Sequence, residues 1–194
     1  VLAKYFKYNE YYCWYFNYIL WYKNVSKKRK IGVIIMVEIK EYQEEYAKEM
    51  SNIIITNMYE INIKDHGKEI IDKLSKHFTE EEIKKNYPKR IKNYVAIEES
   101  EVVGTISINN LRGDTTGTKY IILTLFVKME KHHQGIGTML IKKIENYARS
   151  VGAKELYIPA SIYACEFYRK LGYDYLDGIK EQNEDKEYTL VKYL

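Results

Sequence analysis

The stretch KHHQGIGTML, residues 131–140, places two histidines, a glutamine and two closely spaced glycines directly before an apolar run. Three kinds of ligand fit these residue types: a metal ion at the histidines, a dinucleotide at the glycines, or another anion at the exposed backbone. Adjacent histidines on an extended chain point to opposite sides, and the remaining histidines, His66 and His77, fall in a distant segment expected to be helical. The sequence therefore predicts no metal site.

Neither common nucleotide-binding motif fits the glycines. A Rossmann motif needs a third glycine where Leu140 stands, and a P-loop needs Lys and Ser or Thr where Thr138 and Met139 follow Gly137. What remains is a strand that ends in glycines just before a helix, whose free N–H groups and dipole attract phosphate. A tight turn without a ligand would use the same residues, so the glycines alone leave both interpretations open.

A second segment, SIYACEFYRKLGY at residues 161–173, favours one of them. Together the two segments resemble the GNAT-type N-acetyltransferase superfamily, closely across residues 120–173 and in element order across most of 36–175. The family's acyl-CoA motif, Gln/Arg-x-x-Gly-x-Gly/Ala, falls on residues 132–137, with His132 in place of Gln or Arg. Its second motif begins with Asn, replaced here by Ser161, and the remaining motif positions match at Ala164, Phe167, Tyr168, Lys170, Leu171, Gly172 and Tyr173.

The resemblance implies an N-acetyltransferase that moves an acetyl group from acetyl-CoA to an amine by direct attack on the thioester. The backbone amides of 132–138 would hold the CoA pyrophosphate, and the pantetheine arm would pair in β fashion with the strand before them. The co-substrate is acetyl-CoA, no metal is expected, and the expected binding residues are Leu125, Phe126, Val127, His132, His133, Gln134, Gly135, Ile136, Gly137, Thr138 and Ser161.

Tyr168 is the expected catalytic residue. A phenol with an ordinary pKa of about 10 can donate a proton to a departing thiolate whose own value is about 8.5. The alternative is that its ring only packs on an amphipathic helix. No general base is visible, because the strand 120–128 holds no carboxylate; Thr124 could anchor a water chain instead. Cys165 has no histidine partner and is expected to be a small core residue.

Hydrophobic periodicity places these residues on elements. Strands are expected near 37–39, 94–97, 102–109, 120–128, 156–158 and 187–193, and helices over 42–58, 70–78, 79–88, 138–151 and 164–171, with a capping box at Thr79 and Glu82. The predicted fold class is α/β (α+β): a central mixed, mostly antiparallel sheet flanked by helices on both faces, which the resemblance identifies with the GNAT-type fold.

Residues 36–194 are expected to form a single acetyltransferase domain, and residues 1–35 a separate Tyr/Lys-rich extension. The extension carries seven of the chain's 31 basic groups and one of its 27 acidic groups, so the domain is slightly acidic and nucleic-acid binding has no electrostatic support. Its apolar run, 11–22, is shorter than the ~20 residues that span a bilayer. The run could lie on a membrane surface beside the basic residues 27–30. The preferred hypothesis is that native translation begins at Met36.

The two cysteines lack metal spacing and favour a reducing compartment, so a cytoplasmic location is expected. The acceptor is expected to be a small-molecule or peptide amine. No motif in 42–92 or 111–119 specifies it further, so polyamines, amino acids, aminoglycosides, peptide N-termini and protein lysines are all left open. A homodimer is left open, since relatives are often dimers.

The alternative function is a non-catalytic acyl-CoA-binding or sensing module, because no base is visible and His132 and Ser161 depart from the motifs.

Overall fold

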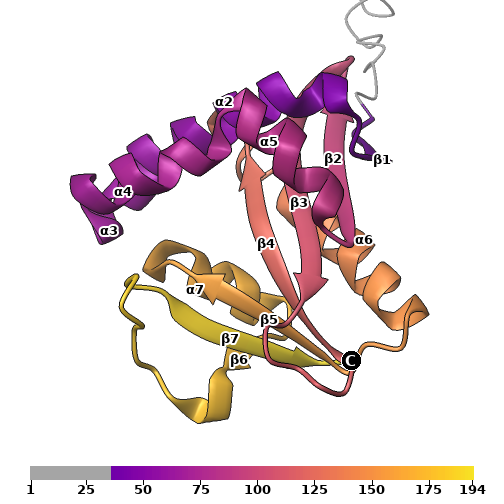
Figure 1. The fold of residues 1–194 in the computed structure, drawn as a ribbon, viewed down its shortest axis with the longest axis vertical. Coiled ribbons are helices and arrows are strands. Elements are labelled where there is room, and N and C mark those ends of the chain that lie inside the picture. The colour runs from indigo at the N-terminus through magenta and orange to yellow at the C-terminus, as the bar shows by residue number, and fades with distance from the viewer. Residues whose placement is uncertain (1–35) are drawn as a thin grey trace, which may run out of the picture. The chain divides into compact units, whose positions relative to one another are not determined.

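The computed structural model describes residues 36–194 (Figure 1). The predictions for residues 1–35 lie outside the described residues. No helix within 36–194 is long and apolar enough to cross a membrane.

Seven strands form one sheet in the order β1-β2-β3-β4-β5-β7-β6. Every neighbouring pair is antiparallel except β4 and β5, so the predicted mixed, mostly antiparallel sheet is confirmed. The two-residue strand β6 was not predicted, because so short a segment carries no period. The strands are β1 (Glu38–Glu41), β2 (Lys92–Glu98), β3 (Glu101–Asn110), β4 (Lys119–Val127), β5 (Glu155–Ala160), β6 (Asp174–Tyr175) and β7 (Tyr188–Tyr193).

Helices cover both faces of this sheet, as predicted (Figure 1). Residues of β2 alternate between two cores: Tyr94 and Ala96 pack with α6, and Val95 and Ile97 pack with α2 and α5. A strand buried on both faces is therefore apolar at successive positions. The α-helices are α2 (Ala47–Asn57), α3 (Ile63–His66), α4 (Lys68–Leu74), α5 (Glu80–Asn86), α6 (Ile136–Ser150) and α7 (Ile162–Lys170), with a π-helical turn at Met58–Asn62 and a 3₁₀ turn at Tyr87–Lys89.

Local signals in the sequence explain where some helices begin and end. The hydroxyl of Thr79 accepts a hydrogen bond from the Glu82 amide (3.3 Å) at the start of α5. The Glu82 carboxylate bonds to Asn86 (2.7 Å) and not back to Thr79, so only half of the predicted capping box forms. After α6 the chain reverses at Gly152, whose φ of 79° is favourable for glycine.

The central feature of the sheet is that β4 and β5 pair only near their first residues. Lys119–Ile121 lie opposite Glu155–Tyr157, and no pairing follows, although β4 continues to Val127 and β5 to Ala160. The other edge of β5 is fully paired with β7. Figure 1 shows β4 and β5 diverging from their common start. One edge of β4 is therefore left without a strand partner in the interior of the sheet.

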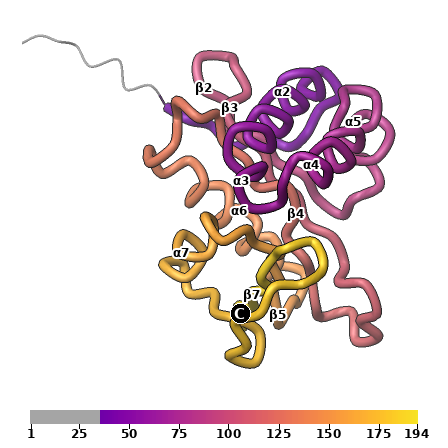
Figure 2. Tube along the Cα trace, turned by 90° about the vertical axis from the view of Figure 1, so that its left-hand side faces the viewer, coloured from indigo at the N-terminus to yellow at the C-terminus, as the bar shows by residue number. Residues whose placement is uncertain are grey.

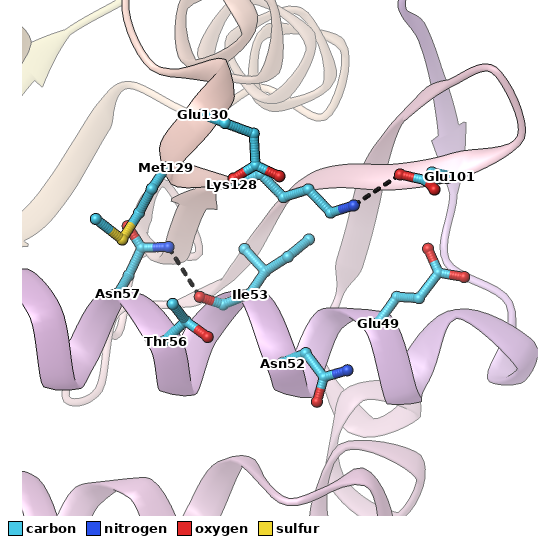
Figure 3. A pocket seen from close by; sticks show the side chains of 9 residues that line it. All are labelled: Glu49, Asn52, Ile53, Thr56, Asn57, Glu101, Lys128, Met129 and Glu130. Atoms are coloured by element: carbon cyan, nitrogen blue, oxygen red, sulfur yellow. Dashed lines mark hydrogen bonds and ion pairs between the residues drawn. The ribbon is translucent and has the colours of Figure 1, made fainter.

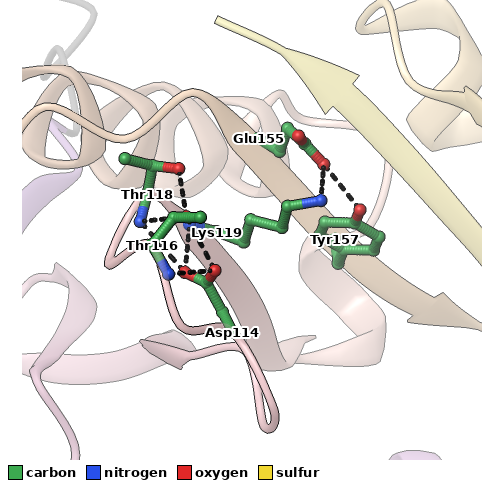
Figure 4. Close-up of polar contacts among 6 residues, drawn as sticks. All are labelled: Asp114, Thr116, Thr118, Lys119, Glu155 and Tyr157. Carbon is green, nitrogen blue, oxygen red and sulfur yellow. Dashed lines mark hydrogen bonds and ion pairs between the residues drawn. The ribbon is translucent and has the colours of Figure 1, made fainter.

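Polar contacts fix the point of divergence (Figure 4). Lys119 Nζ lies 3.2 Å from Glu155 Oε2, and the Tyr157 hydroxyl donates to the same oxygen (2.6 Å). In the preceding loop, the Asp114 carboxylate accepts from the amides of Thr116, Thr118 and Lys119. These bonds, with the Thr116 hydroxyl the largest contributor, lower the Asp114 pKa to about 2. The carboxylate thus holds the loop in the shape that delivers β4 beside β5.

A β-bulge interrupts β4 just before its unpaired end. Thr105 lies opposite Phe126 while Ser107 lies opposite Leu123, so β4 contains one extra residue. Thr124, inside this bulge, has a φ of 51°, which is unfavourable for a β-branched residue. Backbone strain of this kind concentrates at functional sites, which directs attention to the end of β4.

Candidate active site

The backbone of β4 presents different groups at successive residues. The Lys128 amide donates to the Val103 carbonyl of β3 (2.8 Å). In an antiparallel ladder the backbone N–H and C=O groups of alternate residues face the partner strand, so those of Phe126 face Thr105 of β3 and those of Val127 face the open edge. The Val127 carbonyl accepts from Asn57 Nδ2 (3.0 Å) and His132 Nε2 (2.9 Å). The Val127 N–H is left to face the gap. Leu125, like Thr124, lies in the bulge between the paired residues Leu123 and Phe126, and it is partly exposed.

The predicted anion-binding loop, residues 132–138, follows β4 and runs into the first turn of α6. Gly135 is the N-cap residue, and no side chain caps this helix. The His132 ring is bonded to Val127, and Gln134 Nε2 donates to the Glu130 carbonyl (3.0 Å). These side chains shape the loop and leave the first-turn amides of Ile136, Gly137 and Thr138 without intrahelical partners.

Side-chain charge adds little to this site. Lys128 and Lys131, which flank the loop, form ion pairs with Glu101 (2.8 Å) and Glu98. An anion at this loop would therefore be attracted by the backbone amides and the helix dipole. His133, which follows His132 in the loop, is exposed and has a φ of 61°. The loop therefore contains a left-handed residue that is not glycine.

The two glycines of the loop are required for different reasons. Gly135 has a φ of 83° and open space where a Cβ would stand. At Gly137 a Cβ would lie 3.2 Å from the ring of Phe167 on α7. Gly135 thus gives the turn its conformation, whereas Gly137 lets α7 pack against the start of α6. This contact joins the two sequence motifs in space.

Tyr168 lies on α7 with 6% of its surface exposed, and its ring packs edge-on against Phe167 (5.1 Å between centroids) and Tyr173 (6.0 Å). Its hydroxyl has no hydrogen-bond partner within the described part of the chain. Burial, followed by the nearby Cys165 and Glu187, raises the Tyr168 pKa. The hydroxyl therefore stays protonated at neutral pH, which is the form that a general acid needs.

A buried ion pair holds α7 in place. Lys192 Nζ donates to the Leu171 carbonyl at the end of α7 (2.7 Å) and to Glu145 Oε1 of α6 (2.8 Å). The Tyr173 hydroxyl donates to the same Glu145 oxygen (3.1 Å). The segment carrying Tyr168 is thereby connected to the helix whose N-terminus forms the anion-binding loop.

The other residues singled out from the sequence occupy clear positions. Ser161 is the N-cap residue of α7, but its hydroxyl does not cap the helix. Cys165 is buried, and its thiol donates to the Ser161 carbonyl (3.3 Å), which confirms the expected core position. The Thr124 hydroxyl contacts Arg90 Nη1 (2.8 Å) and Ser107 Oγ (2.8 Å).

His66 and Glu187 were not predicted as site residues. His66 is 4% exposed, and its Nδ1 donates to the Asp185 carbonyl (2.7 Å), which ties α3 to the loop before β7 (Figure 2). Burial, then the Asp185 charge, raises the Glu187 pKa, while His66 opposes that rise. The Glu187 charge also contributes to the raised pKa of Tyr168. The contact joins residues 119 positions apart, so no local sequence signal could have revealed it.

A separate cavity of about 300 Å³ lies between α2 and the segment after β4 (Figure 3). Its walls carry Glu49, Glu101 and Glu130 and one lysine, Lys128. None of its lining residues belongs to the predicted site.

Residues 55–173 match the family model of the GNAT acetyltransferases. The chain belongs to this family. As a GNAT acetyltransferase it is an acyltransferase enzyme, and the resemblance carried by the two motifs is confirmed.

Solved structures of other GNAT proteins share the fold. The PaiA N-acetyltransferase of Thermoplasma acidophilum, in complex with coenzyme A, is 17% identical with a TM-score of 0.70, covering 82% of this chain and 99% of its own. A GNAT acetyltransferase of Staphylococcus aureus is 19% identical (TM-score 0.62; 81% and 99% covered). One of Brucella melitensis, in complex with acetyl-CoA, is 20% identical (TM-score 0.53; 72% and 84% covered). No curated protein sequence matches the chain.

The two glycines of this GNAT loop should respond differently to alanine. Gly135→Ala places a Cβ in the left-handed region, which costs roughly 1–2 kcal/mol and distorts the anion-binding turn. Gly137→Ala leaves the backbone unstrained but forces Phe167 to move by a few tenths of an ångström. We expect Gly135→Ala to lower both the stability of the protein and its affinity for CoA. Gly137→Ala alone should lower stability because its Cβ crowds the Phe167 ring, and the added substitution Phe167→Leu should restore that stability. Chemical denaturation measures the stability of each variant, and calorimetry measures its CoA affinity. Equal losses in the two alanine variants, with no recovery in the double variant, would contradict the different roles assigned to the two glycines.

Glu187→Gln should stabilise the protein in a pH-dependent way. Because the Glu187 pKa is raised on folding, ionisation favours the unfolded state, and this loss of stability develops as pH rises from the ordinary value of 4.5 through the raised value. The amide cannot ionise, so the variant should be more stable than the wild type at about pH 7 and nearly equal at about pH 4. Urea denaturation at both pH values checks this, with exposed Glu184→Gln as the control. A gain that is the same at both pH values would show that ionisation is not its cause.

Proposed function

We propose that this acetyltransferase moves an acetyl group from acetyl-CoA to the amine of an acceptor by direct attack, with Tyr168 as general acid. The observation that carries the proposal is the unpaired edge of β4, which leads directly to the uncapped N-terminus of α6. A ligand with an extended, amide-bearing arm and a pyrophosphate matches these two features, because the arm can pair with the strand edge and the pyrophosphate can bind at the helix N-terminus. CoA and acetyl-CoA are the ligands named for the Thermoplasma and Brucella proteins.

The residues of β4 and α6 fit such a ligand. The Val127 N–H would donate to an amide of the pantetheine arm, in the manner of strand addition to an exposed sheet edge. The first-turn amides 136–138 would receive the pyrophosphate. Phe126 would not take part through its backbone, because that backbone pairs with β3. Of the three residues expected on this strand, Val127 and Leu125 thus remain as backbone contacts.

Tyr168 would complete the reaction. The bound thioester supplies an activated acetyl group, and its cleavage leaves a thiolate that needs a proton. The protonated Tyr168 hydroxyl, to which no described residue makes a hydrogen bond, would give one. The acceptor would attack as the free amine and release the proton of its nitrogen to water, because β4 carries no carboxylate that could act as the base.

Tyr168→Phe should lower kcat by about a hundredfold or more with acetyl-CoA affinity unchanged, because only the transferable proton is removed. Release of free CoA over a panel of amines gives the rates, and calorimetry gives the affinity. Tyr163→Phe is the matched control, since Tyr163 lies on the same helix with 59% of its surface exposed.

Full turnover by Tyr168→Phe would contradict its role as the acid. Acetyl-CoA binding without turnover by the wild type, over the whole amine panel, would instead support the non-catalytic sensing module.

A further inference from the structure

Arg90 lies beside the β4 bulge, in the short link between the 3₁₀ turn at Tyr87–Lys89 and β2. Its Nη1 donates to Ser107 Oγ (2.5 Å) and Thr124 Oγ1 (2.8 Å). Its guanidinium carbon sits 3.9 Å from the centroid of the Tyr87 ring. Tyr87 and Ser107 are both fully buried, so a rigid floor fixes the plane of a partly exposed guanidinium.

The charge of Arg90 is not neutralised within residues 36–194. Arg149 and Arg169 pair with Glu145 and Asp174, but no carboxylate lies within 4.0 Å of Arg90. The hydroxyls of Ser107 and Thr124 both contact Nη1, and no described residue accepts a hydrogen bond from Nε or Nη2. A guanidinium offers five N–H donors in a planar fork that matches a carboxylate. The Arg90 guanidinium is held in place, has N–H donors without partners and has no counter-charge nearby. It is therefore suited to bind an anionic group of a ligand.

The position of Arg90 indicates which ligand supplies that group. Thr124 lies in the bulge, before Leu125 and Val127 along the open edge of β4, whereas the amides proposed for the pyrophosphate follow that edge, at 132–138. The phosphates of CoA would thus lie at the far end of the edge from Arg90. The partner that approaches the thioester at the bulge is the acceptor.

We propose that Arg90 binds a carboxylate of the acceptor, so that the preferred acceptors are small amines that also carry a carboxylate, such as free amino acids. This inference rests on the proposed acetyl transfer. It makes Arg90 a specificity-determining residue with no part in the proton transfers. Ser107, Thr124 and Tyr87 would act through Arg90 by holding its fork toward the acceptor.

Matched acceptor pairs test the inference. Each pair consists of a free amino acid and its carboxamide, which differ in charge but hardly in size; lysine, tyrosine and methionine cover cationic, aromatic and aliphatic side chains. For the wild type, kcat/KM should favour the carboxylate member at least tenfold in one or more pairs, since charge-assisted bidentate bonds are among the strongest polar contacts. Arg90→Gln should abolish that preference, mainly through KM, with acetyl-CoA affinity unchanged.

Two variants separate recognition from folding. Arg90→Lys keeps the charge but loses the fork, so it should retain only a small part of the preference. Lys89→Gln removes an adjacent exposed charge and should leave the preference intact. Thermal unfolding of each variant verifies that the fold persists.

Transfer to the carboxamides at rates equal to or above those of the amino acids would overturn the inference and leave the proposed function standing. A carboxylate preference that persists in folded Arg90→Gln would also overturn it. Absence of transfer to every amine, including amines without a carboxylate, would overturn the proposed function and this inference together.

Discussion

The unpaired edge of β4 is the constraint on which the rest of the structure depends. Buried or half-buried backbone groups need hydrogen-bond partners, and a strand that lacks one inside a sheet is a site for an added strand. The edge exists because β4 and β5 are held together at Lys119 and Glu155 and then separate. The opposite edge of β4 pairs with β3, and the Val127 carbonyl accepts hydrogen bonds from Asn57 and His132. These contacts keep the open edge in place.

The two sequence motifs form one site because their helices pack together. Gly137 provides the space that Phe167 fills, and Lys192 binds both Glu145 of α6 and the last turn of α7. Tyr168, the residue after Phe167, is thereby placed relative to the helix N-terminus by rigid contacts. Catalytic geometry tolerates little displacement, so the role proposed for Tyr168 would explain why residues without chemistry of their own belong to both motifs.

The strands, the main helices and the glycine turn before α6 could be predicted from the sequence, because each depends on local patterns such as the apolar run 120–127 and the glycine at 135. The roles of Arg90, His66 and Glu187 could not, because they arise from contacts between elements far apart in the chain. The reason for Gly137 was also hidden: its φ is ordinary, and only the packed structure reveals the ring of Phe167 beside it. His132 stands out in the sequence, yet its ring bonds to the protein's own backbone.

Residue-resolved amide hydrogen exchange with and without saturating acetyl-CoA tests most directly whether β4 accepts a ligand as an added strand. The Val127 amide faces the open edge, and its exchange should slow by about tenfold or more when acetyl-CoA is bound. The Phe126 amide, already paired with β3, should change little. Unchanged exchange at Val127 in protein saturated with acetyl-CoA would contradict the account.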